Sequence, residues 1–367
     1  MDKELLYQIA LTLVPGLGPV LARKLVSTCG SAGEVFSESS SRLIKLPGIG
    51  ANVVSSIKNR ELLERAGREL EFIGNNGVRA LFFLDDNYPK RLRQCHDAPL
   101  LLYIKGELDC LEYPKMVAVV GSRRMTEYGR DNCERLVGEF TEFSAVIVSG
   151  LAYGVDACAH RFASSAGLPM VAVLGHGLDR IYPRVHSGLA GSIMENGLLV
   201  TEFISGTTPA RENFPRRNRI IAGLADAVVV IEAALSGGAL ITADLANSYN
   251  RDVFALPGRV NDRYSQGCNK LIRINKAHLI ESARDMQYIM NWKQGEKLGR
   301  QTGLFVVLTR EERVITDYLH SNGESGIDEI VAGTGFNLGL CTSILLGLEF
   351  KGVVRAMPGR CFRLLSR

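Results

Sequence analysis

The chain has 367 residues, of which 46% are hydrophobic and 22% charged, so two or three domains are expected and a disordered or fibrous chain is excluded. The net charge of +4 permits nucleic-acid binding without indicating it. No apolar run reaches the ~18 residues of a membrane span and no signal-peptide pattern opens the chain, so we expect a cytoplasmic protein without membrane contact. The eight cysteines form no C-x-x-C pair and have no histidine at metal spacing, so reduced, packed thiols and no metal site are expected.

Residues 1–77 are predicted to form a helical domain. Two similar turns, VPGLG at 14–18 and LPGIG at 46–50, lie about 32 residues apart, and each precedes a helix-like run. This pattern is similar to the tandem (SAM-like) helix-hairpin-helix motif, in which backbone N–H groups at a helix start approach a DNA phosphate. Tight helix connections need the same glycines, so DNA contact and a structural or partner-binding role both stay open.

Residues 78–292 alternate strand-like and helix-like segments. Short strands are expected at 80–84 and 100–104, and buried strands at 116–120, 145–149, 170–174, 197–200, 227–231, 252–256 and 277–280. This alternation predicts an α/β fold, with a parallel sheet covered by helices on both faces. Ligands of such sheets bind at the carboxyl ends of the strands.

Several of those strand ends carry glycine or small polar residues. They occur at 121–123, 149–150, 175–177, 236–238 and 257–258, and together they predict a groove lined by backbone. No G-x-G-x-x-G follows the first buried strand and no P-loop sequence occurs, so NAD and P-loop ATP binding are disfavoured.

The segment 211–244 combines the features of an anion site. Four arginines and one glutamate fall within nine residues around Phe214, and a helix is expected from Pro215 to Leu224. The glycine turn at 236–238 lies between a strand and a helix that opens at Ala239, where free backbone N–H groups attract anions. A phosphate-bearing polymer is favoured over a small metabolite.

The C-terminal third unit is predicted to be small. Residues 293–307 are polar and glycine-containing, as in a linker. Residues 308–367 show three helix patterns, at 311–320, 327–332 and 338–351, followed by strands at 353–356 and 361–364, an order that resembles a winged helix. The expected recognition helix is apolar and ends in one lysine, which favours packing or protein contact over DNA reading.

The motifs of the central region resemble those of the DprA (Smf) family. They are GSR at 121–123, SGLAYGVD at 149–156, VLG at 173–175, FPRRNRIIAG at 214–223 and SG at 236–237 with ITA at 241–243. The resemblance spans about residues 80–282. Two departures are the turn at 274–276, where a Gly-Ala pair is expected, and Gly238, which loosens its turn.

This resemblance implies an extended Rossmann core that binds single-stranded DNA without sequence specificity. It also implies a homodimer formed through that core, loading of the recombinase RecA during natural transformation (competence), and no enzymatic activity or cofactor. The DNA groove carried over from the family comprises Ser122, Arg123, Ser149, Gly150, Gly175, Arg211, Phe214, Arg217, Asn218, Arg219, Ser236, Gly237 and Lys270.

The roles expected in this groove follow from side-chain chemistry. Arginines hold phosphates through charge-assisted hydrogen bonds, and the glycine and serine turns offer N–H groups. Phe214 either stacks on a base or acts as a hydrophobic staple for the following helix. Spacing alone does not rank Arg123 against Arg124, or Arg216 against Arg217.

An enzyme is the alternative. Residues 236–244 resemble the phosphate turn of nucleoside-monophosphate phosphoribohydrolases, but Leu240 and Ile241 replace its glycine and threonine, and Asp244 is shorter than its glutamate. Asp156 and His160, spaced i and i+4, fit acid–base catalysis or, more simply, a helix cap and a buried hydrogen bond. A binding surface is therefore favoured.

Overall fold

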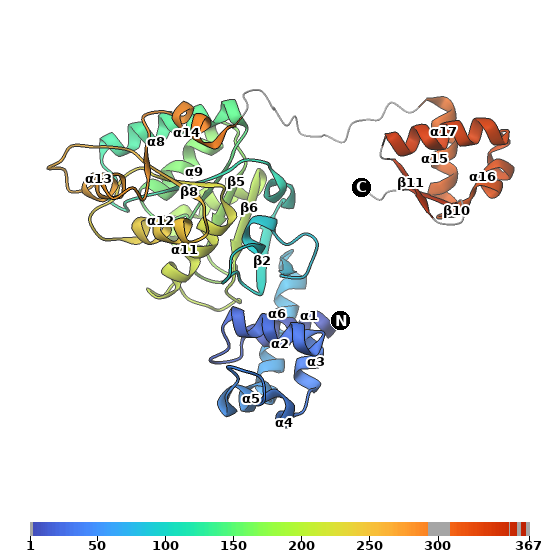
Figure 1. The fold of residues 1–367 in the computed structure, drawn as a ribbon, viewed down its shortest axis with the longest axis horizontal. Coiled ribbons are helices and arrows are strands. Elements are labelled where there is room, and N and C mark those ends of the chain that lie inside the picture. The colour runs from blue at the N-terminus through green and yellow to red at the C-terminus, as the bar shows by residue number, and fades with distance from the viewer. Residues whose placement is uncertain (1–2, 293–308, 352, 358–360, 365–367) are drawn as a thin grey trace. The chain divides into compact units, whose positions relative to one another are not determined.

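The computed structural model describes residues 3–292, 309–351, 353–357 and 361–364 (Figure 1). The chain divides into two compact units, Met1–Lys297 and Leu298–Arg367. The predicted linker, 293–307, lies outside the described residues. The helical segment and the sheet core pack together within the first unit, so the boundary expected at residue 77 stays a prediction.

The N-terminal segment is helical, as predicted. Its helices are α1 Lys3–Thr12, α2 Pro19–Cys29, α3 Ala32–Ser37, α4 Ser40–Leu43, α5 Ala51–Ile57 and α6 Arg60–Asn76. In the two similar turns, Gly16 and Gly48 adopt φ of +76° and +90°, a conformation that favours glycine. Gly18 and Gly50 instead have extended backbone just before α2 and α5. Each turn thus uses its first glycine for backbone reversal and its second to begin a helix.

A nine-stranded sheet forms the core of the first unit. Its strands are β1 Arg79–Phe82, β2 Leu101–Gly106, β3 Met116–Val120, β4 Val146–Ser149, β5 Met170–Val173, β6 Gly197–Thr201, β7 Ala227–Val230, β8 Asp252–Ala255 and β9 His278–Leu279. Their order is β1-β2-β6-β5-β4-β3-β7-β8-β9, and the pairs from β6 to β9 are parallel. β2 pairs antiparallel with β6 and β1 with β2, which extends the parallel sheet at one end.

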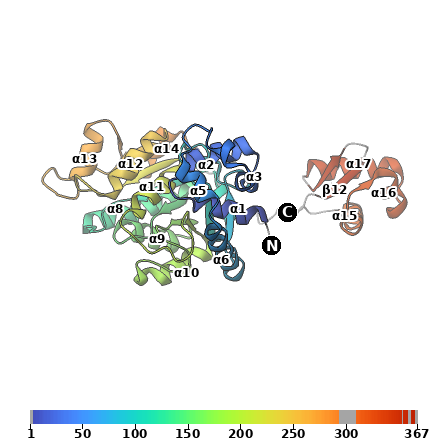
Figure 2. The same ribbon diagram turned by 90° about the horizontal axis from the view of Figure 1, so that it is seen from below.

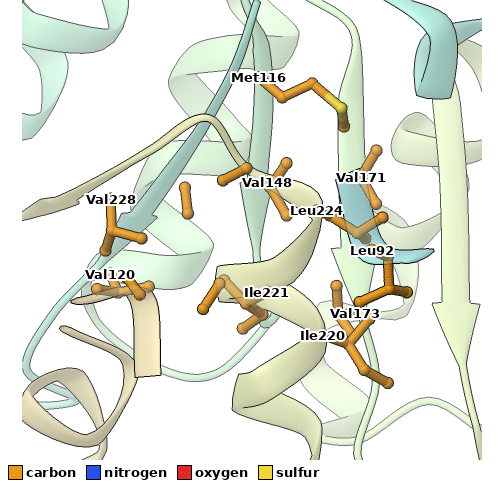
Figure 3. Packing of buried hydrophobic residues seen from close by; sticks show 14 of the residues in the cluster. Leu92, Met116, Val120, Val148, Val171, Val173, Ile220, Ile221, Leu224 and Val228 are labelled. Carbon is orange, nitrogen blue, oxygen red and sulfur yellow. The ribbon is translucent and has the colours of Figure 1, made fainter. Parts of the chain in front are cut away.

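Helices cover both faces of this sheet because its central strands are apolar on both sides. The helices are α7 Lys90–Arg93, α8 Glu127–Glu139, α9 Val155–Ser165, α10 Ser187–Glu195, α11 Asn213–Leu224, α12 Gly238–Ser248, α13 Gln266–Arg273 and α14 Ala283–Met290, with 3₁₀ turns η1 Leu108–Glu112, η2 Phe140–Phe143 and η3 Arg184–His186. Val120 and Val228 pack toward Ile221 of α11 on one face (Figure 3). Val117 and Val119 face the other core, under α8 and α9. Figure 2 shows α8, α9 and α10 on the opposite side of the sheet from α11 and α12.

The hairpin β1–β2 belongs to two cores at once. Leu102 and Ile104 point into the sheet core, whereas Leu101 and Tyr103 point into the core of the N-terminal helices. The buried carboxylate of Glu69 on α6 also accepts hydrogen bonds from the backbone N–H of Ser205, at 2.9 and 3.0 Å. The N-terminal helices are therefore fastened to the sheet core through both apolar and polar contacts.

The second unit contains α15 Arg310–Asn322, β10 Ser325–Gly326, α16 Ile327–Thr334, α17 Leu338–Phe350, β11 Val354–Met357 and β12 Cys361–Leu364. The three helices and the strand pair match the predicted pattern, and the short β10 adds a third strand in the order β10-β12-β11. Ile315, Ile330 and Leu345 from the three helices meet in a small core.

Within the described residues, no single helix is long and apolar enough to cross a membrane. Only α16 and α17 taken together reach that length and apolarity, and a bend of 111° separates them.

Candidate nucleic-acid interface

A pocket opens where β3, β4 and β5 end, because the carboxyl ends of parallel strands meet at one edge of the sheet. Its volume is about 340 Å³, including solvent at its mouth. It is lined by Arg123, Gly150, Ala152, Tyr153, Gly175, His176, Tyr182, Pro183 and Phe214. Four of the predicted groove residues, Arg123, Gly150, Gly175 and Phe214, are thus brought together.

Arg123 and Phe214 form the centre of this pocket. The exposed Arg123 guanidinium carbon lies 4.9 Å from the centroid of the Phe214 ring, a cation–π arrangement. Among the described residues, no carboxylate lies within ion-pair distance of Arg123. Arg124 is also exposed but does not line the pocket. The pairing with Phe214 therefore distinguishes Arg123, which spacing could not rank.

Phe214 is positioned by the start of α11. The helix begins at Asn213, two residues before the predicted start, so Phe214 lies inside its first turn rather than before it. The staple interpretation is therefore wrong, because that role requires a residue preceding the helix cap. A Cβ at Gly175 would approach the Phe214 ring to 3.2 Å, and the Tyr182 ring lies 6.2 Å from it between centroids. One edge of the ring is packed and the other borders the pocket.

Arg217 is not part of an exposed basic wall, contrary to prediction. Its side chain turns inward from α11 and is only 3% exposed, and its Nη1 donates to the carbonyl of Val173 at 2.8 Å. Burial lowers its pKa to about 10. A Cβ at Gly150 would lie 1.6 Å from the same Nη1, so the guanidinium sits directly beneath this part of the pocket. The charge of Arg217 can therefore act on the pocket only across the Gly150 backbone that lies between them.

Arg216, the neighbour of Arg217, points to the surface. Its guanidinium stacks over Phe203 at 5.0 Å and lies 3.8 Å from the Glu202 carboxylate. Consecutive helix residues point in different directions, which explains why one arginine is exposed and the other buried.

Arg219 and Asn218 also have structural partners where DNA contacts were predicted. Arg219 is 11% exposed in its side chain, and it bonds the Glu202 carboxylate and the Asp97 carbonyl. The near-buried Asn218 donates from Nδ2 to the carbonyl of Gly238 at 3.1 Å, which holds the start of α12. Both side chains therefore already have partners within the protein.

The serines after β3 and β4 differ in accessibility. Ser149 is fully buried and its hydroxyl donates to the Val119 carbonyl at 2.6 Å, so it does not line the pocket as predicted, whereas Gly150 beside it does. Ser122 is partly exposed, and its hydroxyl accepts from the N–H of Arg124 at 3.0 Å. Ser122 thus shapes the loop that carries Arg123.

The remaining predicted residues are exposed but do not line the pocket. Ser236 and Gly237 form an open turn at the start of α12, where Gly237 has φ of +149°. Arg211 precedes α11 and Lys270 lies on α13, and both are exposed. They provide accessible cations and backbone N–H groups away from the pocket.

The residues considered for catalysis are poorly placed for it. Asp244 lies at the surface in an ion pair with Lys276, at 2.6 Å. Asp156 and His160 are buried under the sheet edge; burial raises the pKa of Asp156 and lowers that of His160 to about 3. The predicted helix cap and buried hydrogen bond are not seen: the cap residue of α9 is Gly154, and both ring nitrogens of His160 lack a hydrogen-bond partner in the described structure.

Comparison with known proteins identifies the family. Residues 79–291, more than half of the chain, match the family model described as DNA recombination-mediator protein A. The chain belongs to the DprA (Smf) family. Residues 9–60 match a SAM-like helix-hairpin-helix tandem, as predicted for this segment. A role in DNA processing and recombination follows from the family.

The similarity extends over most of the chain in several bacteria. The chain is 45% identical over 203 residues to DNA processing protein DprA of Streptococcus pneumoniae, covering 55% of this chain and 71% of that one. It is 35% identical over 327 residues to the putative DprA of Mycobacterium tuberculosis, covering 85% and 84%. Protein Smf of Escherichia coli is 36% identical over 289 residues, covering 76% and 75%.

Two solved DprA structures share the fold. The crystal structure of the Streptococcus pneumoniae protein matches with a TM-score of 0.64 and 34% identity, over 79% of this chain and 99% of that one. The Helicobacter pylori protein matches with a TM-score of 0.54 and 32% identity, over 59% and 97%. That second structure is described as revealing a unique mode of single-stranded DNA binding.

Sequence reasoning missed part of the pocket of this DprA-family chain. Tyr153, His176 and Tyr182 line it, and exposed rings of Tyr153 and Tyr182 extend its aromatic surface. His176 accepts from the N–H of Tyr182 at 3.2 Å, and burial lowers its pKa. The available signal was that Tyr153 lies in the SGLAYGVD motif at 149–156 and His176 in the strand end at 175–177.

Proposed function

We propose that this protein binds single-stranded DNA without sequence specificity and loads the RecA recombinase onto it. The observation that carries the proposal is the pairing of Arg123 with Phe214 at the pocket. The cation suits a backbone phosphate, and the aromatic rings around it suit unstacked bases of any sequence. Only a single strand presents both groups together, since the bases of a duplex are stacked inside.

The exposed residues outside the pocket support a longer binding path. Arg211, Lys270 and the turn at 236–237 lie at the surface, where they can contact further phosphates. The family's role as a recombination mediator supports the RecA step. We also propose that the protein acts as a homodimer in the cytoplasm. We also propose that the chain is not an enzyme, since Asp244 is held in a surface ion pair.

Binding can be tested by fluorescence anisotropy with single- and double-stranded oligonucleotides of several sequences. Arg123→Ala should weaken single-strand binding about tenfold for every sequence and reduce the slope of log affinity against log salt by about 0.7, the value for one phosphate contact. Arg124→Ala is the matched control because Arg124 is equally exposed outside the pocket. Preference for duplex, or equal effects of the two substitutions, would contradict the proposal.

The RecA step needs a separate assay. ATP hydrolysis by RecA on DNA already coated with single-strand-binding protein should start faster when this protein is added, and Arg123→Ala should remove that acceleration. An unchanged lag with wild-type protein, despite normal DNA binding, would contradict recombinase loading alone.

A further inference from the structure

The sheet has a switch point between β3 and β7, on the side of β3 opposite to the ends of β4 and β5 that line the pocket. The chain proceeds from β3 to β4 on one side, and β7 lies on the other side of β3. In doubly wound sheets this is where nucleotide phosphates bind, against the N-terminus of the helix that follows the first strand. Here that helix is α8, whose cap residue is Thr126.

A carboxylate of the protein itself occupies this position. Glu232 follows β7 and is 1% exposed. Its carboxylate accepts from the backbone N–H of Thr126 at 2.9 Å and from the Thr126 hydroxyl. Its own carbonyl accepts from the N–H of Ser122 at 2.8 Å, which closes the gap between the ends of β3 and β7. These contacts are the ones that a bound phosphate would make.

The surrounding glycines fit this carboxylate closely. A Cβ at Gly129, in the first turn of α8, would lie 2.3 Å from Oε2 of Glu232. A Cβ at Gly121 would lie 2.5 Å from the Val155 side chain and 3.0 Å from the Glu232 carbonyl oxygen, so this glycine makes room mainly for α9. In nucleotide-binding sheets glycines at these positions let a phosphate approach the backbone. Here the same lack of side chains admits an internal glutamate.

We infer that Glu232 is an internal anion that closes the nucleotide-phosphate position of this fold. Its carboxylate takes the N–H and the hydroxyl of Thr126 at the cap of α8, and a second anion beside it would meet an uncompensated like charge. Free nucleotides are thereby excluded from the switch point, and phosphates are confined to other surfaces. Glu232 thus determines ligand specificity by excluding free nucleotides from the switch point. This inference does not depend on the proposed function.

The test uses small anions to replace the missing carboxylate in the full-length chain. Glu232→Ala should lower the melting temperature by about 4 °C or more, because the backbone N–H and the hydroxyl of Thr126 lose their acceptor. Sodium formate or phosphate should then restore several degrees relative to sodium chloride at equal ionic strength, and should leave the wild type nearly unchanged. Glu127→Ala, an exposed glutamate on the same turn, is the control and should show neither effect.

Glu232→Gln keeps the cavity filled, so it should show a smaller fall and no response to formate. If the Glu232→Ala protein is obtained in folded form only when formate is present, that result would also support the inference. The inference is overturned if Glu232→Ala melts like the wild type, or if formate and phosphate stabilise the wild type, Glu232→Gln and Glu232→Ala equally. It is equally overturned if Glu232→Gln matches the wild type and Glu232→Ala fails to fold in either salt.

Discussion

Replacement of Arg217 by methionine separates the stability of this protein from its DNA affinity. The guanidinium is buried beneath Gly150 with a single hydrogen bond, from Nη1 to the Val173 carbonyl, while its Nε has no partner in the described structure. Methionine is of similar length and carries no charge. The nearby Asp156 carboxyl favours the charged guanidinium, but the effect of burial is larger, so removal of the charge should be tolerated by the fold.

The magnitude follows from the pKa of Arg217. A fall from 12.5 to about 10 corresponds to a cost of about 3 kcal/mol for keeping the group charged, at about 1.4 kcal/mol per pH unit. Because the folded-state pKa is the lower one, this cost is constant at neutral pH and is relieved only as the pH rises through 10. Loss of the hydrogen bond to the Val173 carbonyl lowers the free energy of unfolding by about 1–3 kcal/mol. Arg217→Met should therefore leave stability unchanged or raise it by up to about 2 kcal/mol.

Urea unfolding and anisotropy with a single-stranded oligonucleotide measure the two effects. Arg217→Met should weaken DNA binding about tenfold, since a unit charge under the pocket acts through a low-dielectric layer. Arg130→Met, which removes an exposed charge on α8 outside the pocket, is the control. A loss of more than about 2 kcal/mol in stability, together with DNA affinity equal to that of the control, would refute this reasoning.

Three further substitutions test other parts of the molecule. Phe214→Ala should lower single-strand affinity by about 5- to 150-fold, the value of one stacked base, whereas Phe214→Tyr should retain it in the same anisotropy assay. Arg219→Ala should reduce unfolding free energy by about 2 kcal/mol, because Glu202 loses its main partner; an unchanged urea midpoint would contradict this. The pKa of His160 is about 3 when folded and 6.5 otherwise, so stability should fall as the pH drops from 6.5, by about 2 kcal/mol at pH 5. His160→Gln should abolish that pH dependence, and equal slopes for both proteins would show that other groups cause it.

The strands and the edge that carries the pocket were predictable because local signals agreed. Several buried strands are apolar runs that end in glycine or a small polar residue, as in Val146–Ser149 before Gly150. The start of α11 was misplaced because proline is acceptable anywhere in the first turn, so Pro215 did not mark the first residue. That shift of two residues decides the position of Phe214.

The directions of the arginines could not be predicted. Arg216, Arg217 and Arg219 look alike in a basic run, but one reaches the surface, one lies under Gly150 and one binds Glu202. Their partners are Val173, Asp97 and Glu202, which come from three other segments of the chain. The order of charged residues along the sequence does not show which distant segments each of them will contact.

The shared hairpin β1–β2 has a consequence for how this protein can be divided. Leu101 and Tyr103 on one side of the hairpin are covered by the N-terminal helices, and Phe82 lies in the same cluster. A truncated chain that starts at residue 78 would leave these apolar side chains in water, on a strand at the end of the sheet. An apolar face exposed in this way favours aggregation. The helical segment therefore cannot be exchanged as an independent module, and recombination between related genes would have to transfer it together with the hairpin.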